Sequence, residues 1–166
     1  MKRFILKVAC FFAIVVAIDI IAGMAFPYLV ANAKGGDNGR NNYICLKTNE
    51  DILIFGSSRA IHHYHPTIIS DSTGMTCYNC GQDGNGVILN YGRLLMIENR
   101  YKPKMIIYDI QNSYDLTAGE ENHKYLAWLK AYYDHDGVED VFVSVDSVER
   151  YKMMSNLYRY NSKCVQ

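Results

Sequence analysis

Hydrophobic residues dominate the first thirty positions of the chain. Val8 to Ile18 is an unbroken apolar run, and after Asp19 the run resumes from Ile20 to Leu29. A helix rises about 1.5 Å per residue and needs roughly 20 residues to cross a hydrocarbon core of about 30 Å. The pattern therefore predicts a membrane-spanning helix over residues 8–30, with Asp19 as a tolerated polar residue within it.

The residues that flank this run predict how it is oriented. Lys2, Arg3 and Lys7 precede it, and basic residues tend to stay on the cytoplasmic side. Residues 1–33 are thus expected to form a single-pass membrane anchor, with everything after residue 33 on the extracytoplasmic side. Ala31-Asn32-Ala33 has the small-x-small form of a signal-peptidase site, so a cleaved signal is the alternative. We favour the anchor because a secretory apolar region usually spans only about 7–15 residues.

Beyond residue 42, short apolar runs alternate with longer segments of helical spacing. Residues 34–42 read KGGDNGRNN, a composition that predicts a flexible linker, and residues 43–166 then form the folded domain. Strands are expected at 51–55, 76–79 and 105–110, and helices at 86–101, 121–133 and 138–158. This alternation predicts an α/β domain with a mainly parallel sheet.

The net charge of the chain limits the kinds of molecule that it is expected to bind. The chain has 17 basic and 17 acidic side chains, of which three and one, respectively, fall within residues 1–33. The exported domain therefore has a net charge of about −2 and no basic stripe, which excludes a nucleic-acid partner. With 49% hydrophobic and 20% charged residues, the composition is that of a globular protein.

Candidate chemistry gathers where the three predicted strands end. In open α/β sheets, ligands bind beyond the carboxyl ends of the strands. The first strand is followed by Gly56-Ser57-Ser58, the second by a glycine-rich loop that contains Gly81 and Gly84, and the third by Asn112. No Gly-Lys-Ser/Thr follows those glycines, so a nucleotide-binding loop is not indicated.

In their order and spacing, these three strand ends resemble the SGNH (GDSL-like) hydrolase family, whose first blocks are Gly-x-Ser, glycine and asparagine. The resemblance covers residues 51–116. It implies a three-layer α/β/α fold and a serine esterase or acyl-transfer activity without cofactor or metal. The implied substrate is an acylated small molecule or glycan, for example an O-acyl group on a surface glycan.

The resemblance also assigns roles to single residues. Ser58 would be the nucleophile, while the Ser58 N–H, the Gly84 N–H and the Asn112 carboxamide would stabilise the oxyanion. Gly81 is the alternative to Gly84. Should the loop register differ by one, Ser113 is the alternative to Asn112.

One block of the family pattern is missing from this chain. The general base normally comes from a C-terminal Asp-x-x-His, and no such motif occurs; the nearest match ends at His123, too early in the family's order. An SGNH sheet normally has five strands, so we expect a C-terminally truncated domain. We also expect no histidine within hydrogen-bond reach of Ser58, although His62 follows it by one helical turn.

Cys77-Tyr78-Asn79-Cys80, with His62, His63 and His65 upstream, offers a competing interpretation. Cys-x-x-Cys is found in redox and zinc sites. Because Cys77 lies in a predicted strand, the two thiols should point apart, with Cys77 in the core. We therefore expect neither metal nor redox chemistry at these cysteines.

Two functional hypotheses follow from the sequence. The first is a membrane-anchored serine esterase or acyl-transfer domain. The second is a non-catalytic anchored module that keeps the same scaffold for binding or assembly.

Overall fold

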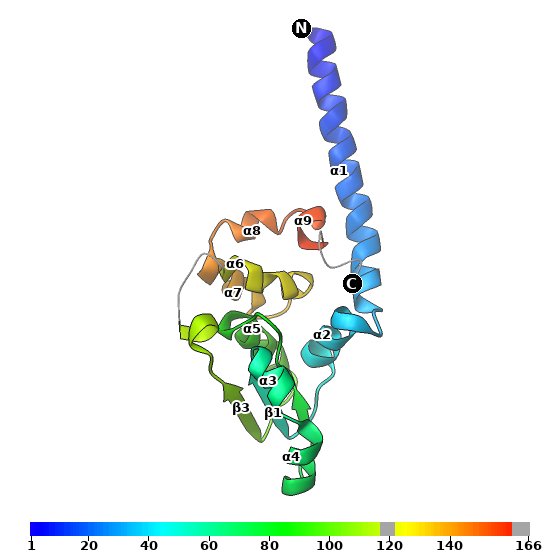
Figure 1. The fold of residues 1–166 in the computed structure, drawn as a ribbon. Helices are drawn as coiled ribbons and strands as arrows, with labels where there is room; N and C mark the ends of the chain where they lie inside the picture. The colour runs from blue at the N-terminus through cyan, green and yellow to red at the C-terminus, as the bar shows by residue number, and fades with distance from the viewer. Residues whose placement is uncertain (117–121, 161–166) are drawn as a thin grey trace.

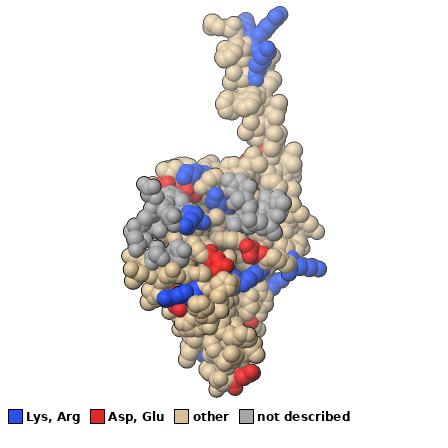
Figure 2. All heavy atoms as spheres, in the orientation of Figure 1, with Lys and Arg blue, Asp and Glu red and all other residues tan. Residues whose placement is uncertain are grey.

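The computed structural model describes residues 1–116 and 122–160, without the side chains of residues 113, 114, 122 and 123. Figure 1 shows an α/β domain with one long helix, α1 (Lys2–Ala31), whose first half extends away from it. This helix is long and apolar enough to cross a membrane, and the large apolar side chains of its first half are exposed. Figure 2 shows this uncharged surface, with Lys and Arg side chains at the outer end of the helix. The predicted apolar helix is confirmed and runs from Lys2 through Pro27 to Ala31.

The three predicted strands form one parallel sheet. β1 (Ile52–Gly56) lies in the centre, between β2 (Cys77–Asn79) and β3 (Met105–Asp109). Every residue of β1 is buried, as expected for a central strand covered on both faces. The α/β class with a parallel sheet is thus confirmed. The SGNH-like three-layer fold with an incomplete sheet stays a prediction.

Helices pack against the sheet and against one another. α2 (Gly36–Leu46) and α5 (Val87–Glu98) contribute Ile44 and Ile97 to a core with Leu53 and Phe55 of β1. α3 (Ser58–His63) directly follows β1, and α4 (Pro66–Thr73) precedes β2. Each connection between parallel strands therefore contains at least one helix, as the parallel pairing requires.

A second core lies between α5 and the C-terminal helices. The segments are α6 (Asn122–Tyr125), the 3₁₀ turns η2 (Leu126–Trp128) and η3 (Lys130–Tyr132), α7 (Val138–Val145), α8 (Glu149–Lys152) and α9 (Asn156–Tyr160). Leu126, Leu129 and Tyr132 are buried at a spacing of three, which a 3₁₀ turn of three residues aligns on one face.

We expected two long C-terminal helices, at 121–133 and 138–158, and this prediction is wrong. The described part of each range is divided into shorter helical segments. The expected helix at 138–158 breaks at Asp146, whose backbone is extended and whose Oδ1 accepts a hydrogen bond of 2.9 Å from the Val148 N–H. Aspartate competes in this way with helical hydrogen bonding. The chain then turns into α8.

The expected flexible linker at 34–42 is helical for most of its length. In α2, Asn41 donates to the backbone oxygen of Trp128 at 2.8 Å, and Asn42 donates to that of Val30 at 2.6 Å. Asn42 also accepts a hydrogen bond from Tyr132 at 2.6 Å. The Gly/Asn composition suggested a loop, but buried acceptors in other segments hold these amides in a helix.

Asp19 is more than a tolerated polar residue. Its carboxylate accepts hydrogen bonds from the backbone N–H groups of Asn156 and Leu157 and from the side chains of Ser155 and Asn156, at 2.7–3.1 Å. It thereby caps the N-terminus of α9, whose first N–H groups have no partners within the helix. The second half of α1 is consequently attached to the domain.

Candidate functional site

The structure places each proposed site residue immediately beyond a strand or in the loop that follows it. Ser58 is the first residue of α3, Gly84 lies in the turn between β2 and α5, and Asn112 begins a short π-helix, η1 (Asn112–Leu116), after β3. All three follow the carboxyl ends of parallel strands, which share one edge of the sheet.

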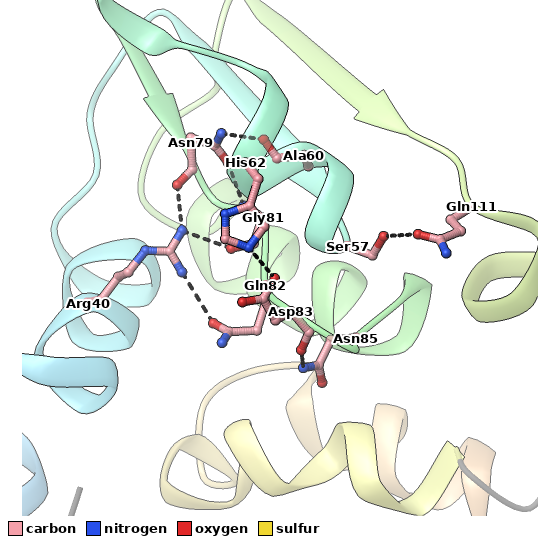
Figure 3. Close-up of polar contacts among 10 residues, drawn as sticks. All are labelled: Arg40, Ser57, Ala60, His62, Asn79, Gly81, Gln82, Asp83, Asn85 and Gln111. Atoms are coloured by element: carbon pink, nitrogen blue, oxygen red, sulfur yellow. Dashed lines mark hydrogen bonds and ion pairs between the residues drawn. The ribbon is translucent and has the colours of Figure 1, made fainter.

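Hydrogen bonds join the three loops that follow β1, β2 and β3 at this edge, which we call the first, second and third loops (Figure 3). The Gln82 N–H donates to the Gly56 oxygen at 3.1 Å, which links the second loop to the first. The Ser57 hydroxyl donates to Oε1 of Gln111, which links the first loop to the third. Arg59 adds a second link to the third strand, with its Nη2 2.6 Å from Oδ1 of Asp109.

The two adjacent serines differ in their surroundings. Ser57 is fully buried and its hydroxyl is engaged with Gln111. Ser58 is partly exposed, and its hydroxyl makes no hydrogen bond within the part of the chain that the structure describes. Only the Ser58 hydroxyl is thus available to an incoming molecule, whereas Ser57 has a structural role that the sequence did not indicate.

The geometry also separates the two candidate glycines. A Cβ at Gly81 would lie 2.7 Å from the Ile61 nitrogen, and the Gly81 N–H already donates to Oδ1 of Asn79 at 2.9 Å. Gly84 has a left-handed φ of +62°, and a Cβ there would meet open space. Among the described residues nothing accepts a hydrogen bond from its N–H. Of the two, Gly84 is the one that leaves a donor free.

A histidine and a carboxylate face each other one helical turn after Ser58. Nε2 of His62 lies 2.9 Å from Oδ1 of Asp83, and the two side chains are 60% and 58% exposed. Figure 3 shows the pair connecting α3 to the second loop. In the described part of the chain, no hydrogen bond joins the Ser58 hydroxyl to a histidine side chain. The side chain of His123 lies outside the described residues.

Two arginines, one from α2 and one from α5, donate hydrogen bonds to the backbone of the second loop. Arg40 donates to the backbone oxygens of Asn79 and Gly81, both at 2.8 Å (Figure 3), and Arg93 donates to that of Cys80 at 2.9 Å. Both also donate to Oε1 of Gln82 at 3.2 Å. Three consecutive carbonyls are therefore directed toward guanidinium groups. Sequence reasoning missed both arginines, because Arg40 lay in the presumed linker and Arg93 in a helix.

The cysteine pair has a different arrangement from the one expected. Cys80, not Cys77, is in the core, and burial raises the pKa of the Cys80 thiol to about 12. Burial also raises the pKa of Cys77, which is partly exposed on β2. A reactive thiol requires a lowered pKa. Among the described residues, no three His, Cys, Asp or Glu side chains are grouped so that they could hold a metal ion.

No protein-family model, curated protein or solved structure matches this chain. The resemblance to SGNH hydrolases therefore depends on the strand-end residues described above.

Proposed function

We propose that this chain is a membrane-anchored, extracytoplasmic serine esterase or acyl-transfer domain of SGNH type, with Ser58 as its nucleophile. The observation that carries the proposal is the accessibility of the Ser58 hydroxyl and its lack of a hydrogen-bond partner among the described residues. Ser58 lies where three joined strand-end loops meet.

In the proposed reaction, the Ser58 oxygen attacks an ester carbonyl and the carbonyl oxygen becomes an oxyanion. The Ser58 N–H, the Gly84 N–H and the Asn112 carboxamide would donate hydrogen bonds to it. Loss of one such donor commonly costs about 2.7–4 kcal/mol of transition-state stabilisation. The open space at Gly84 supports this role, because a carbonyl can approach the backbone there.

His62 is the residue best placed to accept the serine proton. It follows Ser58 by four residues on α3, and side chains four apart on a helix are neighbours. Because Asp83 contacts Nε2, the Nδ1 atom is the nitrogen left for the proton. Asp83 would then stabilise the imidazolium, and such general-base assistance is typically worth about 10²–10⁴-fold.

The second candidate function, a non-catalytic binding or assembly module, is favoured by one observation. No hydrogen bond joins the side chains of Ser58 and His62, and the His62 ring contacts Asp83 instead. A serine without a base is about as nucleophilic as an ordinary alcohol. On this hypothesis the loops would bind an acylated glycan without cleaving it.

An activated-serine probe distinguishes the two functions. The full chain in detergent micelles is treated with a fluorophosphonate, and labelling is located by peptide mass. We expect labelling at Ser58 that Ser58→Ala abolishes and that His62→Ala slows by about 10²-fold or more. His63→Ala is the matched control, since this neighbour is also exposed, and should label at the original rate.

Absence of labelling in a folded sample would contradict the enzyme and support the module. The module also predicts slow p-nitrophenyl acetate hydrolysis that Ser58→Ala barely changes. Labelling that His62→Ala leaves unchanged would retain Ser58 but remove His62 from the mechanism.

A further inference from the structure

The end of the domain nearest the first half of α1 carries an exposed apolar surface. Val148, Tyr151 and Met154 are 49%, 70% and 79% exposed and follow one another at intervals of three along the turn that contains α8. Glu149 and Met153, between them, are buried. The three exposed side chains, the α8 face, thus point away from the core.

The position of this end along α1 is set by direct contacts. Figure 1 shows α9 beside α1 and α8 next to α9 on the side away from α1, both at the end of the domain that faces the N-terminus. Asp19 holds the start of α9, and Phe26 packs on Tyr160 with ring centroids 6.2 Å apart. A Cβ at Gly23 would lie 2.5 Å from Nδ2 of Asn156, so the two helices touch closely.

This attachment shortens the part of α1 that is free to cross a bilayer. From Lys2 to Asp19 the helix rises about 25 Å, at about 1.5 Å per residue. The hydrocarbon core is about 30 Å thick, and tilt reduces the reach further. If Lys2 and Arg3 lie at one headgroup layer, the opposite boundary of the core falls at or beyond Asp19, at the level of α9.

We propose that the α8 face enters the interfacial layer of the bilayer that α1 spans. This inference rests on the proposed membrane location of α1. Tyrosine is enriched in this layer, and Met154 and Val148 supply apolar contact. The lysine and arginine of α8 can extend their charged ends toward water.

The charges at this end indicate which lipids matter. Arg150 pairs with Glu139 at 2.8 Å, and Lys152 pairs with Glu149 at 2.7 Å and lies 3.7 Å from Asp146. These side chains carry two positive and three negative charges, so attraction to anionic headgroups is not the driving force. We expect insertion into phosphatidylcholine alone, without dependence on salt.

Tryptophan quenching by brominated lipid tests the proposal. The chain has one tryptophan, so Trp128→Phe gives a background in which a single inserted tryptophan reports its surroundings. Tryptophan replaces Tyr151 on the α8 face, Phe11 in α1, or Ile68 on α4 at the far end of the domain. Each full-length variant is reconstituted into phosphatidylcholine vesicles with bromine high on the acyl chains.

We expect Tyr151→Trp and Phe11→Trp to be quenched, with emission at shorter wavelength, and Ile68→Trp to be unaffected. Quenching of Phe11→Trp without Tyr151→Trp overturns the interfacial surface and leaves the anchor intact. A blue shift of Tyr151→Trp without quenching overturns it in favour of a protein partner or a second copy. An unquenched Phe11→Trp overturns the membrane anchor itself.

Loss of the Asp19 contact provides a second measurement. Asp19→Ala removes the acceptor of four hydrogen bonds at the start of α9. We expect weaker quenching of Tyr151→Trp in this variant while Phe11→Trp stays quenched. Unchanged quenching at Tyr151 would show that Asp19 does not set the depth of the domain.

Discussion

Three adjacent residues at the end of β1 have three different roles. Gly56 adopts a φ of +142°, Ser57 is buried against Gln111, and Ser58 is left accessible. The glycine allows the chain to turn sharply at the end of the strand, and the buried serine joins that turn to the loop after β3. The position of the Ser58 hydroxyl therefore depends on both of its neighbours.

Gly56→Ala should destabilise the protein by about 2–3 kcal/mol, since glycine-only backbone strain costs about 1–3 kcal/mol and a clash adds to it. The new Cβ would lie 2.8 Å from the Asp109 oxygen. Chemical denaturation followed by circular dichroism measures the loss. Gly74→Ala is the control, because its φ of +68° carries strain but its Cβ meets nothing within 4 Å. Equal losses would show that the contact with β3 is unimportant.

At the scale of elements, the second loop is shaped by helices that lie behind it. Arg40 of α2 and Arg93 of α5 bind its carbonyl oxygens. Arg93 is fully buried, burial lowers its pKa, and it also donates to Oδ1 of Asn41 at 2.9 Å. The loop that presents Gly84 and Asp83 thus takes its shape from α2 and α5.

Arg93→Lys should lower the free energy of unfolding by about 2–4 kcal/mol. The Arg93 guanidinium donates to three acceptors, on Asn41, Cys80 and Gln82. A lysine ammonium cannot reach all of them and would leave buried acceptors without a hydrogen bond. Denaturant unfolding of the full chain in micelles gives the value. Arg150→Lys is the comparison, because its ion pair with Glu139 is exposed and should change stability by less than about 0.5 kcal/mol. Similar effects at both positions would contradict a specific role for Arg93.

At the scale of the whole molecule, each of the two hydrophobic cores buries a cysteine thiol that must stay protonated in the folded protein. Burial raises the pKa of Cys45 and of Cys80 from 9.0 to about 12. The thiol of an unfolded chain ionises above pH 9, while the folded thiols do not. The unfolded state therefore binds fewer protons between pH 9 and 12, and stability falls as pH rises through this window.

We expect the melting temperature to be steady below pH 9 and to fall steeply between pH 9 and 11. Each buried thiol contributes up to about 1.4 kcal/mol per pH unit within this window. Melting curves from pH 7 to 11 test this. Cys80→Ala should lower stability at pH 7 through the cavity it leaves, but its decline with pH should be shallower. A decline as steep as that of the original chain would mean that Cys80 does not titrate as described.

The sequence by itself determined the features that depend on local patterns. Continuous apolar runs identified α1 and the central strand β1, whose burial on both faces excludes polar alternation. The Gly-x-Ser at the end of β1, the glycines after β2 and the asparagine after β3 indicated the edge of the sheet where the candidate site residues lie. These predictions needed no knowledge of which segments meet.

The tertiary structure decided what each polar residue contacts. The asparagines of α2 form a helix because Trp128 and Val30 supply acceptors, and Asp19 caps α9 more than 130 residues away along the chain. Ser57 rather than Ser58 is engaged in the interior because Gln111 approaches it from the loop after β3. Such partners are brought together by packing of distant segments, so composition and spacing within one segment could not reveal them.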